Sequence, residues 1–395
     1  MRAVVTGMIA TFPLGGVAWD YCQYAAGFER LGLEVYYLED TGLPTYVVNT
    51  SSGELELNCD YGALFLEQSL SAFSPTLGRR WHFRSFDNKI YGLSADAFAE
   101  IIAEADILIN VSGGTLLREP YRRCARKIFI DTDPGWNHFV IFPRWEDKPA
   151  AERPFGFRSH DFFFTFAERM GQPDCPLPDY GLRWHATRHP VLPEFWEPLP
   201  PGERYTTIMT WNAYDTVVAA HGLKPVEYAG VRYGSKEMEF DKIEQLPNRV
   251  QVSLELAVNG ANAPRERLQE LGWSVISGPC VSRTAETYNA YIAGSRGELS
   301  VAKNIYVATK SGWFSGRSAC YLAAGRPVIL QDTGFSEVIP IGEGLLAFSN
   351  VDEAAASLEL VETNYDKHSR RAREAAETYF DGRLVLLKML SDVGL

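Results

Sequence analysis

The chain has 395 residues, of which 46% are hydrophobic and 22% are charged, and its formal net charge at pH 7 is −12. A chain of this length and composition can bury a large core and favours two domains over one. The acidic balance argues against a nucleic-acid partner, because affinity for a phosphate backbone needs a basic surface and the sequence contains no basic run.

The cysteine pattern and the first residues bear on the cellular compartment. The six cysteines are far apart and form no CxxC pair, so neither a zinc site nor a disulfide framework is indicated. Met1 leads directly into a strand-like run without a basic segment or cleavage site, and no run of about 18 apolar residues occurs. We therefore expect a cytoplasmic protein without a membrane span.

Strands and helices alternate along the first half of the sequence. Residues 2–10 form a strand-like run, and a glycine-containing loop separates them from a helical pattern at 17–32 and a strand at 34–40. The pattern repeats with a helix at 94–105 and strands at 106–114 and 128–136, whose carboxyl ends carry small or acidic residues. Such a series favours a parallel sheet that binds ligands at the edge where its strands end.

A second alternating series follows a proline-rich stretch at 175–201, which is typical of an interdomain linker. Its expected strands lie at 205–211, 273–278, 304–309 and 327–332, and its expected helices at 264–272, 285–295 and 317–325. We predict an α/β fold of two doubly wound, Rossmann-like domains, residues 1–200 and 201–375, facing across a cleft. A final helical segment, 376–395, can bend at Gly382 and cross back to the first domain.

The turn at 311–318 is rich in glycine and serine and directly precedes a helical run. Backbone N–H groups in the first turn of a helix lack intrahelical partners, and together with the helix dipole they attract an anion such as phosphate. Three serines and Arg317 exceed what a helix cap needs. The turn therefore predicts a phosphate-binding site.

Two regions resemble the GT-B glycosyltransferases. Residues 321–358 contain a small-residue helix, Gly325, Pro327, a strand, Asp332 and Gly334, then two further glycines and a closing strand, and they resemble the donor-binding half of that superfamily. Residues 12–40 resemble its acceptor-side opening. The resemblance implies transfer of a hexose from a nucleoside diphosphate sugar, such as a UDP or TDP sugar, to a small, natural-product-like hydroxyl acceptor, without a bound cofactor.

The resemblance gives the turn before the helix a role. Ser315, Gly316, Arg317 and Ser318 would cradle the diphosphate, and Arg317 would supply the full charge while contributing little to the core. The loop glycines Gly15 and Gly16 would face the cleft. The alternative is a helix cap with a surface ion pair at Arg317. Donors of this kind stabilise the leaving diphosphate and can replace a metal ion, so we expect metal-independent transfer.

One departure from the superfamily concerns the ribose. Many retaining members carry two glutamates separated by seven residues around this helix, whereas this chain has Gly312 and Cys320 at the roughly comparable positions. Glu298 could serve the ribose instead. The missing pair favours inversion of the sugar's stereochemistry.

Further donor-side candidates follow the strands of the second series. Lys236 and Lys303 could contact the phosphates, although isolated lysines are usually solvated surface residues. In QDTGF, Asp332 could accept hydrogen bonds from sugar hydroxyls beside Thr333 and Gly334, or it could be a structural turn residue.

An inverting transfer also needs a general base on the acceptor side. The candidates are Asp20, near the start of the first helix, and Asp131, Asp133 and His138 just past a strand end. Structural turn aspartates are the alternative for each, and the spacing of Asp131 and Asp133 could also suit Mg²⁺. The neighbouring aromatic residues could form an apolar acceptor pocket, namely Trp136, Phe139, Phe142 and Trp145.

Three other functions fit parts of the pattern. A nucleotide-sugar epimerase of the same fold would turn over the donor alone. A dinucleotide-dependent oxidoreductase is disfavoured, because no GxGxxG follows the first strand. A noncatalytic sugar-binding protein would be exported, and the sequence shows no export signal.

Overall fold

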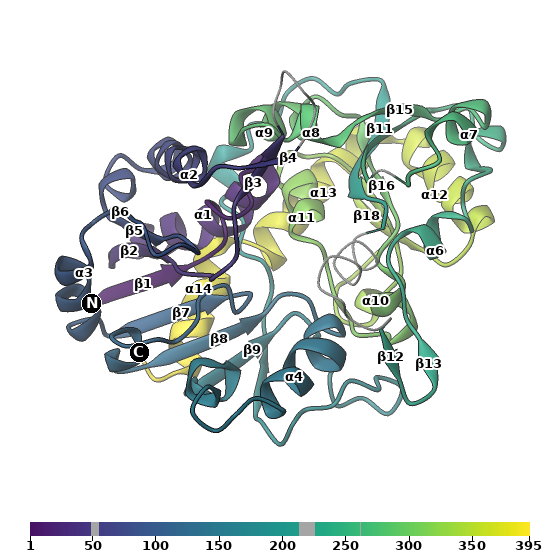
Figure 1. The fold of residues 1–395 in the computed structure, drawn as a ribbon. Helices are drawn as coiled ribbons and strands as arrows, with labels where there is room; N and C mark the ends of the chain where they lie inside the picture. The colour runs from purple at the N-terminus through teal and green to yellow at the C-terminus, as the bar shows by residue number, and fades with distance from the viewer. Residues whose placement is uncertain (49–54, 213–225, 261) are drawn as a thin grey trace.

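The computed structural model describes residues 1–48, 55–212, 226–260 and 262–395. They form two parallel sheets, one in each half of the chain, with helices on both faces (Figure 1). This is the α/β fold of two Rossmann-like domains that the sequence predicts.

The N-terminal sheet has eight strands, all paired in parallel except for β5 and β6 at one edge. Its order is β10 (Trp184–Ala186), β9 (Phe162–Thr165), β8 (Lys127–Asp131), β7 (Ile107–Val111), β1 (Arg2–Thr6), β2 (Glu34–Glu39), β5 (Trp81–Arg84) and β6 (Ile90–Gly92). The central strands are buried on both faces and read as continuous apolar runs, as a sheet covered on both sides requires.

The C-terminal sheet has six parallel strands. Its order is β15 (Ser274–Ser277), β14 (Ser253–Asn259), β11 (Arg204–Thr210), β16 (Gly297–Ser300), β17 (Val328–Gln331) and β18 (Leu345–Phe348). Two small hairpins lie outside the sheets, β3 (Tyr46–Val48) with β4 (Leu55–Leu57) and β12 (Glu227–Tyr228) with β13 (Val231–Arg232).

The helices connect the strands. Their bounds are α1 (Gly15–Arg30), α2 (Cys59–Phe73), α3 (Ala95–Ala103), α4 (Phe142–Glu146), α6 (Glu237–Phe240), α7 (Arg265–Glu270), α8 (Gly278–Val281), α9 (Ala285–Ala293), α10 (Asn304–Ala308), α11 (Gly316–Ala323), α12 (Val351–Thr363), α13 (Tyr365–Tyr379) and α14 (Gly382–Asp392). A single hydrophobic cluster joins buried residues of α1, α2, α11 and α14, so the two halves share a core. None of the described helices is long and apolar enough to cross a bilayer.

One expectation about the second series is wrong. Residues 304–309, expected as a strand, form α10, and the neighbouring GELS segment provides β16 instead. A short apolar run cannot be assigned by periodicity alone, and here the side chain of Asn304 accepts a hydrogen bond from the backbone N–H of Gly234 and so ties the helix start to another loop. The proline-rich stretch is also more than a linker, because it contributes β10 to the first sheet.

The last helix crosses back to the N-terminal half, as the sequence allows. α13 ends at Tyr379, and the side chain of Asp381 then caps α14 by accepting hydrogen bonds from Arg383 and Leu384 N–H. α14 packs so closely on α1 that a Cβ added to Gly27 would lie 2.5 Å from Cδ1 of Leu386. Both chain termini consequently lie in the N-terminal half (Figure 1).

Candidate functional site

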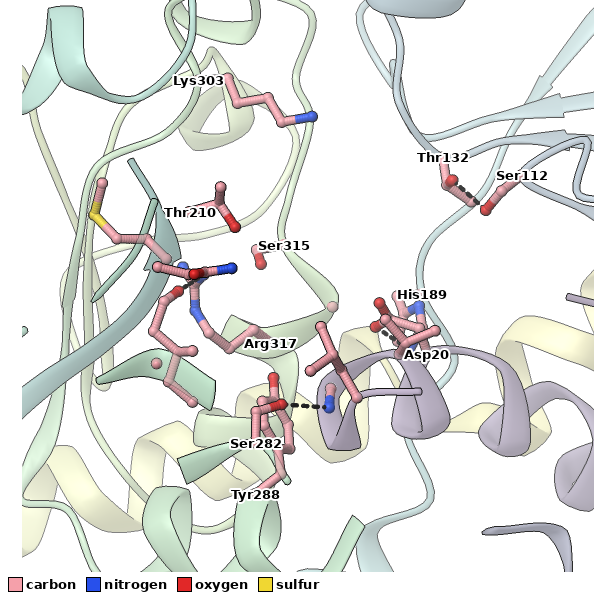
Figure 2. Close-up of a pocket in the computed structure, with 18 of the residues that line it drawn as sticks. Asp20, Ser112, Thr132, His189, Thr210, Ser282, Tyr288, Lys303, Ser315 and Arg317 are labelled. Atoms are coloured by element: carbon pink, nitrogen blue, oxygen red, sulfur yellow. Dashed lines mark hydrogen bonds and ion pairs between the residues drawn. The ribbon is translucent and has the colours of Figure 1, made fainter. Parts of the chain in front are cut away.

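A cavity of about 520 Å³ lies between the two halves, where the carboxyl ends of both sheets meet (Figure 2). The N-terminal half lines it with Leu14, Gly16, Val17, Asp20, Tyr21, Val111, Ser112, Thr132, Phe166 and His189. The C-terminal half lines it with Ile208, Met209, Thr210, Ser235, Lys236, Asn259, Gly278, Pro279, Ser282, Tyr288, Lys303, Trp313, Ser315, Gly316 and Arg317. Ligands bind at this edge in doubly wound sheets.

The glycines at the start of α1 bring the two halves into direct contact. The Gly15 N–H donates to the carbonyl of Ser282 at 2.7 Å, and the Gly16 N–H donates to Oγ of Ser282 at 3.0 Å. A Cβ on Gly15 would lie 2.1 Å from the carbonyl oxygen of Thr284. Gly16 lines the cavity. Gly15 does not, and its missing side chain allows the backbone of α1 to approach the backbone at Thr284.

Asp20 lies in the first turns of α1, and its carboxylate reaches the cavity. Its side chain is 53% exposed, but the exposure is to the interior of the cleft. The surrounding protein desolvates the carboxylate and raises its pKa to about 7, while the nearby charge of Arg317 opposes that shift. Asp20 can therefore exchange a proton near neutral pH.

His189 lies beside Asp20, with its Nε2 atom 3.7 Å from Oδ1 of Asp20 (Figure 2). The Leu192 N–H donates to Oε1 of Gln23, which turns the amide nitrogen of Gln23 toward Nε2 of His189, 3.3 Å away. Nε2 therefore accepts, and Nδ1 carries the ring proton. Burial lowers the pKa of His189 to about 3, so the ring is neutral.

Arg317 lines the cavity, but its donors point into the C-terminal sheet. Its Nε donates to Glu298 at 2.6 Å, its Nη1 to the carbonyl of Ile208 at 2.6 Å, and its Nη2 to Oγ of Ser300 at 2.8 Å. Glu298 is completely buried. The expectation that Arg317 contributes little to the core is wrong, because it neutralises a buried carboxylate. Glu298, in turn, does not line the cavity.

The start of α11 contributes the remainder of the predicted cradle. Ser315 is the N-cap residue, makes no side-chain cap hydrogen bond and lines the cavity with Gly316. A Cβ on Gly316 would lie 2.8 Å from Cγ of His189 and 3.1 Å from Oδ1 of Asp20. Ser318 points away, and its buried hydroxyl has no partner among the described residues. The cradle is therefore smaller than the sequence predicts.

The two candidate lysines both line the cavity, in different settings. Lys236 is only 8% exposed, and its ammonium group makes no hydrogen bond to the described residues. Burial lowers its pKa well below the usual value, and the positive charge of Arg317 lowers it further. Lys303 instead forms an ion pair with Asp133, at 2.7 Å, that bridges the two halves.

The candidates after β8 are structural. Asp131 is buried and accepts hydrogen bonds from Asn137, His138 and Thr165. His138 is also buried, and both of its ring nitrogens face acceptors, Oδ2 of Asp131 at 3.0 Å and the carbonyl of Pro178 at 2.7 Å. Both ring nitrogens are therefore engaged by groups of the N-terminal half. The structure does not bring it into the cavity, and it corrects that expectation.

Asp133 and the aromatic residues near it are also outside the cavity lining. Asp133 accepts hydrogen bonds from Lys303 and from the hydroxyl of Tyr306. Phe139 stacks on Tyr228, and Phe142 stacks on Phe157. The apolar acceptor pocket expected from Trp136, Phe139, Phe142 and Trp145 is absent from the described residues, and Phe166 and Trp313 line the cavity instead.

The QDTGF turn organises its own backbone. Asp332 accepts from the N–H groups of Gly334 and Ser336, and Thr333 donates from its hydroxyl to the carbonyl of Trp313. Gly334 has a φ of 88°. None of the three residues lines the cavity, so a structural turn, and not sugar binding, fits their contacts.

No cluster of three or more metal-ligating side chains exists within residues 1–48, 55–212, 226–260 and 262–395. Asp131 and Asp133 each accept hydrogen bonds from donors of the protein, so they do not present a shared set of oxygens to a cation.

Several lining residues are absent from the sequence predictions. His189 lies in the proline-rich stretch that has the composition of a linker, so nothing in its local pattern marks it. Ser282 and Tyr288 belong to loops and helices whose contribution depends on how the two halves dock. The positions of Thr132 and Asn259, at strand ends, are the signal that could have found them.

Comparison with known proteins identifies the fold. No protein-family model and no curated protein matches the sequence. Among solved structures, a glycosyltransferase from Rickettsia africae is 13% identical, with 99% of this chain and 97% of that chain covered and a TM-score of 0.50. HepE from Anabaena, in complex with UDP and glucose, is 10% identical over the whole of both chains with a TM-score of 0.56.

AviGT4, a glycosyltransferase involved in avilamycin A biosynthesis, is 14% identical over 99% of this chain and 96% of that chain, with a TM-score of 0.50. These glycosyltransferase structures match at least 99% of this chain, and they show that the chain has the GT-B fold. Because one fold can host several functions, the reaction must be argued from the cavity.

Proposed function

We propose that the protein is a glycosyltransferase that moves a hexose from a nucleoside diphosphate sugar to a hydroxyl group of a small acceptor. The observation that carries the proposal is the division of charge across the cavity. Lys303 and Arg317 belong to the C-terminal wall, and the acid Asp20 belongs to the N-terminal wall (Figure 2). Lys236 is a third cation of the C-terminal wall.

The C-terminal wall fits a diphosphate. Lys236 is buried beside other cations, which lowers its pKa, and a bound anion would relieve both the repulsion and the loss of hydration. Ser315 and the first N–H groups of α11 add hydrogen-bond donors at the same place. As the glycosyl bond breaks, negative charge grows on the diphosphate, and these groups stabilise it.

The N-terminal wall fits the acceptor hydroxyl. Asp20, with its pKa near 7, is well suited to take a proton from a hydroxyl at neutral pH. Asp20 comes from the half opposite Lys236, and a base supplied by that half supports attack from the side of the sugar away from the leaving diphosphate, so the proposal includes inversion. The proposal includes metal independence, since lysine and helix donors supply the positive charge at the diphosphate.

UDP is the first nucleotide to test, because HepE was solved with UDP and with UDP-glucose. Wild type should bind UDP more tightly than UMP in calorimetry, and Lys236→Met should weaken UDP binding at least tenfold, as expected for a charge-assisted contact of about 1.5–3 kcal/mol. Lys148→Met is the matched control, because Lys148 is exposed at the surface and forms its ion pair with Glu152, outside the cavity lining. Unchanged UDP affinity in Lys236→Met would remove the support for this donor site.

The reaction itself is tested with EDTA-treated protein. Sugar transfer should persist in EDTA, and transfer restored only by Mg²⁺ would refute metal independence. Turnover of the nucleotide sugar to an isomer without any acceptor would instead establish the epimerase alternative.

A further inference from the structure

The N-terminal wall of the cavity is nearly uncharged. Its described residues are apolar side chains and hydroxyl groups, with Asp20 as the one acid and with the neutral ring of His189. Ser112 and Thr132 share a hydrogen bond of 2.6 Å, and the Tyr21 hydroxyl donates to Ser112 at 3.2 Å. These hydroxyls can bind polar groups of a ligand but cannot neutralise an anion.

The described cations of the cavity all belong to the other wall. An acceptor carrying phosphate or carboxylate would have to compete with the donor diphosphate for them, because burying an unpaired charge costs several kcal/mol. The wall therefore selects against anionic acceptors. Its apolar part, with Leu14, Val17, Val111 and Phe166, favours a ligand with an apolar body.

Exposed apolar side chains also lie on segments that pack beside the loop leading to the cavity. We call this region the mouth surface, and it consists of Phe12, Leu14, Tyr46, Leu57, Tyr61 and Leu64, each at least 38% exposed. Tyr46 and Leu57 are cross-strand partners in the β3–β4 hairpin, so they share a face. Tyr61 and Leu64 are three residues apart on α2 and share a face as well.

The three segments of the mouth surface meet at Ala10. The hydroxyl of Thr45, next to β3, donates to the carbonyl of Ala10 at 3.1 Å, and a Cβ on Gly62 of α2 would lie 2.3 Å from the same oxygen. Ala10 is two residues before Phe12 in the loop that leads to the cavity residue Leu14. Phe12 and Leu14 of this loop therefore link the hairpin and α2, which pack at its start, to the acceptor wall.

We infer that the acceptor is an uncharged hydroxyl compound with an extended apolar body, whose hydroxyl lies at Asp20 and whose apolar body leaves the cavity over Leu14 onto the mouth surface. This inference rests on the proposed function, and it adds the chemical class of the second substrate. Singly scattered exposed apolar residues need no special role, but several of them on segments packed beside a cavity fit a binding surface.

The test uses a homologous series of uncharged phenols, namely 4-ethylphenol, 4-butylphenol and 4-hexylphenol, and the carboxylated counterpart 4-(4-hydroxyphenyl)butanoate. Their affinities for the full chain are measured by calorimetry in the presence of saturating UDP. Affinity should rise with chain length, by up to about fourfold per buried methylene. The carboxylate should bind at least tenfold more weakly than 4-butylphenol.

Two leucines of similar exposure provide the variant and its control. Leu57→Ser, at a position 49% exposed in the mouth surface, should reduce the gain from butyl to hexyl. Leu384→Ser, at a position 54% exposed on α14, should retain it. A gain that is flat in wild type, or equal in the two variants, overturns the inference, as does tight binding of the carboxylate.

Two further measurements distinguish the acceptor class from the donor site and from self-association. UDP binding is measured first and alone, so a protein that binds UDP but shows no preference for apolar phenols contradicts only the acceptor class, whereas loss of UDP binding contradicts the proposed function. If the wild-type chain is a dimer and Leu57→Ser alone makes it monomeric, the mouth surface is an interface between copies and the inference fails.

Discussion

Arg317 and Glu298 form a buried ion pair directly behind the cavity wall. Arg317→Ala would leave the carboxylate of Glu298 buried without its cation, and breaking such a pair usually costs about 3–5 kcal/mol. We therefore expect a clear loss of stability in denaturant unfolding, in addition to any effect on the donor step.

The control for this prediction removes both charges. Arg317→Met combined with Glu298→Gln should recover much of the stability lost in Arg317→Ala, because no unpaired buried charge remains. An Arg317→Ala variant with wild-type unfolding would show that Glu298 does not depend on the pair.

Glu39 is a second buried carboxylate, located at the end of β2. It accepts hydrogen bonds from the N–H groups of Ala10 and Thr11 and from the Thr11 hydroxyl, and burial raises its pKa from 4.5 to about 7. The folded state therefore holds a proton that the unfolded state releases between these pH values. The contribution of Glu39 to stability should fall as pH rises from about 4.5 to 7, by on the order of 3 kcal/mol.

Glu39→Gln removes this titration. The free energy of unfolding, measured across pH 4.5 to 8, should depend less on pH in the variant than in wild type. Some pH dependence should remain in the variant, because the pKa of Asp20 is raised as well. The two proteins are compared by how steeply the free energy of unfolding changes with pH and not by its absolute value, because the glutamine also lacks the oxygen that accepts from the Ala10 N–H. Parallel curves for the two proteins would exclude a raised pKa at Glu39.

The start of α1 shows why an element depends on its partner half. In Gly15→Ala, the new Cβ would meet the backbone of Thr284 at 2.1 Å, and a backbone atom cannot be moved aside as a side chain can. We expect the two halves to separate at this contact, with a larger radius of gyration in X-ray scattering and weaker UDP binding.

Gly16→Ala is the matched variant for the scattering measurement. Its Cβ would meet the ring edge of Tyr288 at 3.0 Å, and a ring can shift. Its radius of gyration should stay close to that of wild type. Equal scattering of the Gly15→Ala and wild-type proteins would contradict the proposed role of Gly15.

Local sequence patterns predict the elements better than the site. The strands at β1, β2 and β8 and the helices α1 and α11 follow from apolar periodicity, and the turn before α11 does reach the cavity. The direction of Arg317 could not be predicted, because Glu298 and Ser300 come from a neighbouring strand. The strand-end position of His138 predicts a place in the cleft, but the carbonyl of Pro178 that holds it lies 40 residues away.

At the scale of the whole molecule, the last helix of the sequence stabilises the first half of the chain. Leu386 of α14 is fully buried against α1, and Leu386→Ala should cost about 2–5 kcal/mol. Amide exchange should accelerate in β1 and α1 more than in β17. Leu384→Ala, at an exposed position on the same helix, should leave exchange unchanged. Faster exchange confined to the C-terminal sheet would contradict this coupling.

The return of α14 also affects how the protein is made. The strands of the N-terminal sheet are complete at Ala186, but the helix that covers α1 begins only at Gly382. A ribosome adds ~5–20 residues per second, so the new N-terminal half waits roughly 10 to 40 seconds with the apolar surface of α1 uncovered. During that interval chaperones can bind the exposed surface of α1, and the nascent chain can aggregate through it. Termination of translation before residue 382 would release a protein whose N-terminal half lacks the helix that covers α1.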